Sequence, residues 1–274
     1  MTGPISREAV QGAAAGVALI RHVYYFDEVA STSDWARDLA RRAGPAADLH
    51  GTLIVAAHQT AGRGRHGRRW LAPPGAALLF TLILDPARTA GGLPPQEAAR
   101  LVAMAGPVAV CESLAAAVES AATARIKWPN DIMLTGAKAA GLLIEQTASR
   151  GRELLLLGVG VNVNQPPEAF PPNLGQPAAS LFTATGRMHD PGRLLHDLLL
   201  RLDQWLAPGA SAGVAARLNL LCDTVGKIVN IETPAGCMVG TALAVTDAGA
   251  LVVRDPVGRL IEVHSGDVRH CREG

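Results

Sequence analysis

The sequence predicts a mixed α/β domain followed by a small all-β domain. Over about the first 220 residues, apolar strand-like runs alternate with amphipathic helical stretches. After Cys222 only short strand-like runs remain, separated by turn sequences rich in Gly, Asp and Pro. The length of 274 residues suits one large domain plus a small one. We therefore expect a short extension over residues 1–20, a large domain over 21–220 and a small domain over 221–274.

The large domain is expected to begin with a strand, a helix and two further strands. Aromatic and β-branched residues indicate a strand over Val23–Val29. Ser31 and Asp34 have the spacing of a capping box, which opens a helix over 31–42. Two buried strands, Thr52–Ala57 and Ala77–Leu84, enclose a loop rich in arginine and glycine. A loop held at both ends by apolar strands is positioned by the fold.

A long alanine-rich helix follows over Gln96–Ser120, and Pro107 is expected to divide it into two pieces. Of the later strands, Leu154–Asn162 is nearly all apolar and is predicted to lie in the centre of the sheet. The other elements expected before residue 222 are strands at Arg125–Trp128, Asp131–Leu134 and Gly141–Glu145, a proline-rich loop at Pro166–Pro177, and helices at Arg193–Leu206 and Ala212–Leu221.

The small domain is about 50 residues long, which suits a five-stranded barrel of the SH3 type. Its hairpins are predicted from short alternating runs between turn sequences. The strands identified from the pattern are Lys227–Glu232, Met238–Val245, Ala250–Arg254 and Leu260–Val263.

The composition limits the possible classes of protein. The net charge is only +1, which argues against a generally basic nucleic-acid-binding surface. The longest uncharged apolar runs, Ala76–Leu84 and Leu154–Val161, are much shorter than the ~20 residues of a membrane helix. No signal peptide is evident, so we expect a cytoplasmic protein without membrane association. Reduced thiols without a zinc site are expected for the four cysteines, Cys111, Cys222, Cys237 and Cys271.

Residues 58–70, HQTAGRGRHGRRW, concentrate positive charge in a nearly neutral protein. No Asp or Glu occurs between Asp48 and Asp85, so no neighbour in the sequence neutralises the arginines. Glycines let the backbone approach a ligand, so N–H groups and guanidinium groups can converge on one anion. By itself, such a run is equally typical of a solvated basic turn or a nucleic-acid-binding patch.

Three further stretches carry polar groups at the ends of predicted strands. Residues 127–131, KWPND, place a cation, an amide and a carboxylate around one proline turn, although Asn130 and Asp131 can equally cap their own backbone. Lys138 precedes Gly141 at the mouth of a strand, where an exposed loop lysine is the plainer alternative. The apolar run at 158–164 ends in two asparagines, for which a ligand is a natural partner. Only three lysines occur in the chain, and Lys127 and Lys138 are two of them.

Taken together, these motifs resemble the biotin–protein ligase family in both order and spacing. The resemblance rests on Ser31-Thr32, residues 59–68, residues 127–131, Lys138 with Gly141, and residues 158–162, and it spans roughly residues 22–270. It implies a class II aminoacyl-tRNA synthetase-like catalytic domain with a mixed sheet, followed by an SH3-like domain. It also implies two half-reactions: biotin and ATP form biotinyl-5′-AMP, and the biotinyl group then passes to a lysine of a biotin carboxyl carrier domain.

The resemblance also implies a role for each motif residue. Lys138, Arg65 and Asp131 would be catalytic, with Asp131 orienting the acceptor amine or accepting its proton. Mg²⁺ would be held mainly by the ATP phosphates, and no metal-ligating residue is assigned. The residues implied to bind biotin are Ser31, Thr32, Ser33, Gln59, Gly62, Arg63, Gly64, Arg65 and Lys138. Those implied to bind the nucleotide are Arg63, Arg65, Arg68, Lys127, Asn130 and Asn162.

The sequence departs from the family pattern in two places. Ser33 stands where members commonly have Asn, so weaker or water-mediated help with biotin is expected there. Residues 1–20 are too short for the helix-turn-helix domain of the repressor members, so no DNA partner is expected. Trp70 and Trp128 are expected to pack rather than to stack on adenine. A homodimer is possible through an edge strand.

Two other functions remain open from the sequence. The first is a ligase for lipoate or another acyl group on the same fold, because fold does not fix substrate. The second is a nucleic-acid-binding module that uses the Arg/Gly loop. Binding of biotin against lipoate distinguishes the first, and salt-dependent affinity for DNA distinguishes the second.

Overall fold

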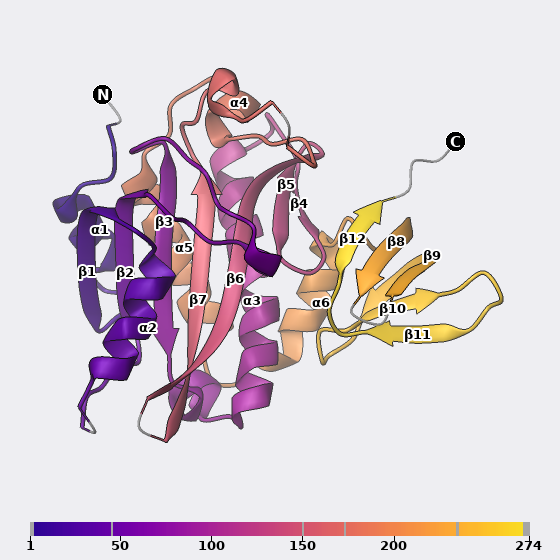
Figure 1. Ribbon diagram of the computed structural model, residues 1–274, viewed down its shortest axis with the longest axis horizontal. Helices are drawn as coiled ribbons and strands as arrows, with labels where there is room; N and C mark the ends of the chain where they lie inside the picture. Colours follow the sequence, from indigo (N-terminus) through magenta and orange to yellow (C-terminus); the bar gives the residue numbers. More distant parts are fainter. Residues whose placement is uncertain (1–2, 45, 150, 173, 234–235, 271–274) are drawn as a thin grey trace.

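A seven-stranded mixed sheet forms the centre of the computed structural model, and a separate five-stranded sheet follows it (Figure 1). The structure describes residues 3–270 except 45, 150, 173, 234 and 235. The described α-helices are α1 (Arg7–Ala14), α2 (Thr32–Arg42), α3 (Pro95–Val118), α4 (Leu181–Thr185), α5 (Pro191–Trp205) and α6 (Ser211–Leu221). The strands of the large sheet are β1 (His22–Val29), β2 (Thr52–Gln59), β3 (Ala77–Leu84), β4 (Ala124–Lys127), β5 (Asp131–Leu134), β6 (Ala137–Ser149) and β7 (Arg152–Asn162).

The strand order in the large sheet is β1-β2-β3-β7-β6-β5-β4. Only β1 and β2 pair in parallel, and every other neighbouring pair is antiparallel. Strand β7 is central and buried from Leu154 to Asn162, as its apolar sequence predicts. The mixed α/β class expected from the sequence is therefore confirmed.

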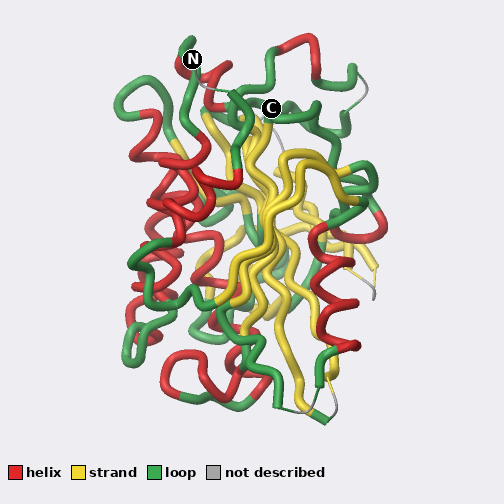
Figure 2. The backbone as a smooth tube through the Cα atoms, turned by 90° about the vertical axis from the view of Figure 1, so that its left-hand side faces the viewer, coloured by secondary structure: helices red, strands yellow, loops and turns green. Residues whose placement is uncertain are grey.

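Helices cover both faces of this sheet, which Figure 2 shows from the side. On one face, α1, α3 and α5 pack with inward-facing side chains such as Leu53, Phe80 and Leu157 into the larger core. On the other face, α2 places Ala36 and Ala40 against Ile54 and neighbouring residues of β3 and β7. Because both faces are covered, the central strands are apolar throughout instead of alternating.

Helix α3 is continuous, so the predicted break at Pro107 is wrong. Pro107 lies inside the helix and is buried, as is Gly106 before it. A residue that precedes proline normally clashes through its Cβ atom in the helical conformation, and Gly106 has no Cβ. The lost backbone hydrogen bond is offset by packing on α5, α6 and the sheet. The helix is long and apolar enough to cross a membrane, but 72% of its most apolar window is buried in the protein, which marks a core helix.

Of the two helices nearest the N-terminus, the sequence predicts α2 but not α1. Helix α2 begins where predicted, and Ser31 caps it by accepting a hydrogen bond from the backbone N–H of Asp34 (3.3 Å). Helix α1 was not anticipated, because residues 1–20 are weakly patterned. It packs on α5 and β1 and buries Val10 and Ala13, so this segment contributes to the main core.

The second sheet comprises β8 (Ile228–Thr233), β9 (Gly236–Val245), β10 (Leu251–Arg254), β11 (Leu260–Val263) and β12 (Asp267–His270). Its order is β11-β10-β9-β8-β12, and all its pairs are antiparallel. The expected small antiparallel β domain is thus present. Strand β12, which the sequence pattern does not separate from its surroundings, returns the chain to the large domain (Figure 1).

Candidate functional site

A cleft of about 710 Å³ lies where the Arg/Gly loop, β5–β7 and β12 meet. This volume is within the range of small-molecule sites. Of the sequence-predicted site residues, all line the cleft except Gly62. The structure therefore brings together groups that are up to about 130 positions apart in the sequence, from Ser31 to Asn162.

One end of the cleft carries uncharged polar groups. The Oε1 atom of Gln59 accepts hydrogen bonds from the backbone N–H of Thr32 (2.7 Å) and from its hydroxyl (3.0 Å). The hydroxyl of Thr81 in β3 lies 2.9 Å from that of Thr32 and 3.0 Å from that of Ser33. Ser31, Thr32, Ser33 and Thr81 are all buried. A buried hydroxyl cluster of this kind can both donate and accept, which suits a neutral ligand with N–H and C=O groups.

Glycines on β6 and β7 form a flat floor next to this end. A Cβ atom on Gly160 would lie 2.7 Å from the indole of Trp70, and one on Gly141 would lie 3.1 Å from it. The indole therefore rests directly on the sheet and lines the cleft. Its Nε1 atom is buried and has no hydrogen-bond partner among the described residues.

Trp128 has a packing role, as expected. It is 3% exposed, and its Nε1 atom donates to the carbonyl of Gly249 in the small domain (3.1 Å).

Arg63 is held by carboxylates at the base of the loop. Its Nη1 atom donates to Asp34 Oδ1 (2.7 Å) and its Nη2 atom to Glu145 Oε1 (2.9 Å). Arg37 bonds to the same Asp34 oxygen and lies 2.9 Å from Glu145 Oε2 without hydrogen-bond alignment. The guanidinium expected at the nucleotide is thus engaged in anchoring the loop to α2 and β6. Arg63, whose backbone pairs with that of Arg69, still borders the cleft.

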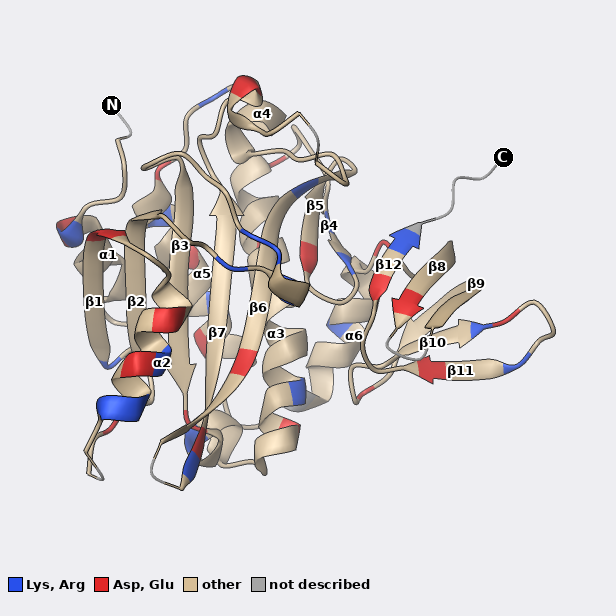
Figure 3. Cartoon of the chain, in the orientation of Figure 1, with Lys and Arg blue, Asp and Glu red and all other residues tan. Residues whose placement is uncertain are grey.

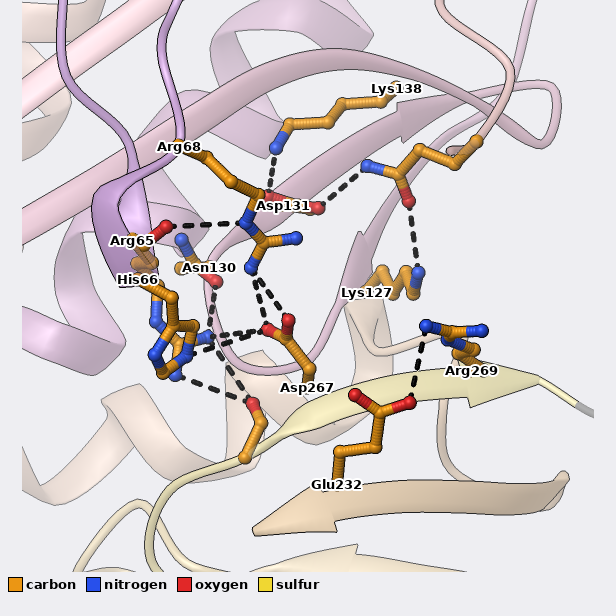
Figure 4. A network of polar contacts seen from close by, with 12 residues as sticks. Arg65, His66, Arg68, Lys127, Asn130, Asp131, Lys138, Glu232, Asp267 and Arg269 are labelled. Atoms are coloured by element: carbon orange, nitrogen blue, oxygen red, sulfur yellow. Dashed lines mark hydrogen bonds and ion pairs between the residues drawn. The ribbon is translucent and has the colours of Figure 1, made fainter. Parts of the chain in front are cut away.

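The tip of the loop docks on the small domain (Figure 4). Arg68 donates to both carboxylate oxygens of Asp267 at the start of β12 (2.8 and 2.7 Å). Arg65 donates to Asn130 Oδ1 (3.0 Å) and to the carbonyl of Gly266 (3.3 Å). Figure 3 shows the blue segments of this loop crossing in front of β7 and β6. No acidic residue lies near this loop in the sequence, and the positive charge of Arg68 is balanced instead by Asp267 from the C-terminal end of the chain.

Asp267 is correspondingly acidic. Partial burial by itself would raise the pKa of this carboxyl. The hydrogen bond and charge of Arg68, together with the charges of His66 and Arg65, outweigh burial and hold the pKa below its ordinary value.

Asp131 and Lys138 form an ion pair on adjacent strands, with 2.6 Å between Nζ and Oδ1. Lys138 is the second residue of β6, which is longer at both ends than the predicted Gly141–Glu145. The side chain of Asn130 is held against β6, because its Nδ2 atom donates to the carbonyl of Leu142 on that strand (2.6 Å). The turn over residues 127–131 therefore presents its groups to the cleft from a rigid frame (Figure 4).

A segment of the proline-rich loop closes the cationic end of the cleft. The backbone N–H of Lys138 donates to Pro177 (2.8 Å), and that of Ala179 donates to Lys138 (2.9 Å). Asn162 supports the same segment, since its Nδ2 atom donates to the carbonyl of Ala179 (2.9 Å). Gln176 is thereby placed between Lys127, which donates to its Oε1 atom (3.0 Å), and Asp131, which accepts from its Nε2 atom (3.1 Å).

The ammonium group of Lys127 is affected by this enclosure. Burial lowers the pKa of Lys127, and the nearby charge of Lys138 acts in the same direction, whereas the charge of Asp131 acts against it. Among the described residues, no group of three or more His, Cys, Asp or Glu side chains could hold a metal ion.

The sequence motifs do not predict Gln176 and Asp267, which line the cleft, or Thr81, which hydrogen-bonds to Thr32 and Ser33 behind it. Thr81 had a signal, because it is the single polar residue of an otherwise apolar strand. Gln176 and Asp267 had none, since each reaches the cleft through backbone pairing and domain packing that the local sequence does not encode.

Comparisons with known proteins cover both domains of the chain. Residues 42–164 match the model of the Biotin/lipoate A/B protein ligase family, and residues 224–270 match that of the Biotin protein ligase C terminal domain. A Biotin--[acetyl-CoA-carboxylase] ligase of Mycobacterium tuberculosis is 36% identical over 252 residues, which are 90% of this chain and 89% of the relative. The Bifunctional ligase/repressor BirA of Bacillus subtilis is 32% identical and covers 97% of this chain, which spans 79% of it.

Solved structures of biotin protein ligases have the same fold as this chain. The biotin protein ligase of Aquifex aeolicus in complex with biotin and ATP has a TM-score of 0.73 and 25% identity. The match covers 93% of this chain and all of that one. The biotin protein ligase of Leishmania major in complex with biotin has a TM-score of 0.59 and 25% identity, with 89% of this chain covered and 98% of that one.

Proposed function

The chain belongs to the biotin–protein ligase family, and we propose from that premise that it activates biotin as biotinyl-5′-AMP and transfers the biotinyl group to a carrier-domain lysine. One observation of the site supports this most strongly. A single cleft joins an uncharged polar end, at Thr32, Ser33 and Gln59, to a cationic end at Arg65, Lys127 and Lys138. Biotin has the same polarity, with a neutral ureido head, an aliphatic chain and a carboxylate.

In the first half-reaction, a biotin carboxylate oxygen forms a bond to the α-phosphorus of ATP, and the bond to pyrophosphate breaks. Two anionic groups must approach each other, so the site has to supply positive charge where they meet. We assign this role to Lys138, a compact ammonium that lines the cleft, and to Arg65, which lines the same cleft from the loop. Lys127 and Asn130 also line the cleft, and we assign them to the nucleotide.

In the second half-reaction, the acceptor lysine amine bonds to the acyl carbon, AMP leaves with the electron pair of the broken C–O bond, and the amine loses a proton. Asp131 is the carboxylate in the cleft next to Lys138, and we assign it to orient this amine or accept its proton. Mg²⁺ would enter with ATP as part of the substrate. The carboxylates that line the cleft, Asp131 and Asp267, are each engaged by cations, so the donor set suits a metal held by phosphate oxygens.

The uncharged end favours biotin over lipoate. The dithiolane ring of lipoate has no N–H or C=O group, so the hydroxyls and amide at Thr32, Ser33 and Gln59 would lose their ligand partner. The nucleic-acid hypothesis loses its main support, because Arg63 and Arg68 are paired with carboxylates.

The function is tested by incubating the purified chain with biotin, MgATP and a biotin carboxyl carrier domain. Labelling of the carrier should require all three components, and lipoate should not replace biotin in labelling or in calorimetric binding. Absence of labelling, with a carrier that a characterised ligase does label, would overturn the proposal.

A further inference from the structure

We propose that Gln176 is a positioning residue for the transfer step, holding the Asp131 carboxylate in place when Lys138 turns to the ligand. The inference rests on the proposed function and names a residue that no site motif contains. It follows from a row of four polar side chains: Lys127, Gln176, Asp131 and Lys138. Figure 4 labels Lys127, Asp131 and Lys138 of this row.

The row has a defined direction of donation. Lys127 donates to Gln176 Oε1 at 3.0 Å, and Gln176 Nε2 donates to Asp131 Oδ2 at 3.1 Å. The other carboxylate oxygen, Oδ1, faces Lys138 Nζ at 2.6 Å. The two oxygens of Asp131 thus have different partners, one a charged lysine and one a neutral amide.

The two partners of Asp131 have different tasks. Lys138 is expected to approach the acyl phosphate, so it must exchange Asp131 for ligand oxygens during the reaction. Gln176 carries no net charge and has no such task. After the exchange, the amide is the partner that keeps the carboxylate from rotating with Lys138, at the moment when the acceptor amine arrives.

The backbone fixes Gln176 well enough for this role. Pro177 and Ala179, which follow it on the same segment, are joined to Lys138 by two backbone hydrogen bonds (2.8 and 2.9 Å). Asn162 adds a third bond, to the carbonyl of Ala179 (2.9 Å). A side chain on a segment so closely attached to β6 loses little further freedom when it binds Asp131.

Two variants separate the two contacts of Gln176. Gln176→Glu keeps the length and the acceptor for Lys127, but it replaces the donor to Asp131 with a negative charge. Gln176→Met keeps the volume and removes both hydrogen bonds. Gln204→Glu, at an exposed position of α5 outside the cleft, is the matched control for the change of charge.

The experiment measures the two half-reactions separately on the full chain. Biotin-dependent pyrophosphate release gives the first, and single-turnover transfer from added biotinyl-5′-AMP to a carrier domain gives the second. We expect Gln176→Glu to slow transfer by about tenfold, the factor for a lost hydrogen bond to a charged group, and to change the KM for ATP by less than about twofold. Gln176→Met should slow transfer similarly and also raise the KM for ATP, because Lys127 loses its acceptor.

Two other results would overturn the inference about Gln176, and a third would overturn the proposed function. Transfer within about twofold of wild type in both variants overturns the inference. An equal loss in both half-reactions for Gln176→Glu, with an unchanged melting temperature, also overturns it, because it indicates a general effect on the site. A wild-type chain that forms no adenylate overturns the proposed function itself, and this failure is visible before any variant is compared.

Discussion

The Nζ atom of Lys138 lies 2.6 Å from Oδ1 of Asp131, so the cation expected at the activated carboxylate and the carboxylate expected at the acceptor amine neutralise each other. The two residues occupy adjacent antiparallel strands, β5 and β6, near the register shift between Ile132 and Met133. Their charges are balanced before ligands enter, which lowers the cost of keeping both half-buried. In the proposed mechanism, adenylate formation uses Lys138 and transfer to the acceptor amine uses Asp131.

Replacing Lys138 by alanine should reduce adenylate formation by about 100- to 1000-fold, because the loss removes a charge that acts where the two anions meet. Biotin-dependent pyrophosphate release measures this rate. Lys227→Ala is the matched control, since Lys227 pairs with Asp223 outside the cleft. Near-normal turnover in Lys138→Ala would remove Lys138 from the catalytic group.

Replacing Arg65 by glycine should preserve the fold but release biotinyl-5′-AMP into solution. Arg65 joins Asn130 to Gly266, and in the proposed mechanism its side chain covers the mixed anhydride, so its loss would open that part of the cleft. We expect the release rate to rise by about tenfold or more, the factor for losing one or two charge-assisted hydrogen bonds. Trapping free adenylate measures the rate, with Arg42→Gly at the exposed end of α2 as control. Unchanged release would show that Arg65 does not retain the intermediate.

Replacing Asp267 by asparagine should loosen the loop in a pH-dependent way. The pKa of Asp267 is lowered in the folded protein, so its ion pairs stabilise the protein above the ordinary carboxyl pKa of about 4 and lose this effect as the pH falls through the folded pKa. The pairs are partly exposed, so their contribution is about 1 kcal/mol or less, which corresponds to a melting-temperature difference of at most about 2–4 °C.

Melting curves of wild type and Asp267→Asn from pH 3 to pH 7 test this directly. The difference should be present at pH 6 and shrink below about pH 4. A difference that stays constant across this range would mean that the carboxylate charge does not hold the loop.

Replacing Gly160 by alanine should impair biotin binding. A Cβ atom there would lie 2.7 Å from the indole of Trp70, so the ring has to move off the sheet into the cleft. Calorimetry should show biotin affinity lowered by about tenfold or more, as expected for overpacking that costs about 1–3 kcal/mol. Gly12→Ala, where a Cβ atom meets nothing within 4 Å, is the control. Unchanged affinity would place the ligand away from Trp70.

The sequence predicts the elements best where one local signal dominates. Residues 77–84 were predicted to the residue, because burial on both faces leaves an unbroken apolar run. The continuous α3 was missed because the rule for proline is local, whereas Gly106 and the packing on α5 and α6 decide the outcome. Helix α1 was missed because its short, weakly apolar pattern is stabilised by packing on α5 and β1.

For the site, the sequence motifs identified which segments meet but not how their charges are balanced. Arg63 was expected at the nucleotide, yet Asp34 and Glu145 hold both ends of its guanidinium. Gln176 reaches Asp131 through the backbone pairing of Pro177 with Lys138, a contact that no sequence spacing reveals. Such pairings depend on how distant strands align in the folded sheet, so they require the structure.

The bond from Arg65 to Gly266 spans 201 positions in the sequence. During synthesis at ~5–20 residues per second, the Arg/Gly loop leaves the ribosome roughly 10–40 s before the strand on which it docks. For that interval its arginines have no Asp267 to bind, although Asp34 is already present to hold Arg63. The contact between Arg63 and Asp34 can therefore form early on the ribosome. The contacts of Arg65 and Arg68 with the small domain can form only after β12 has been made.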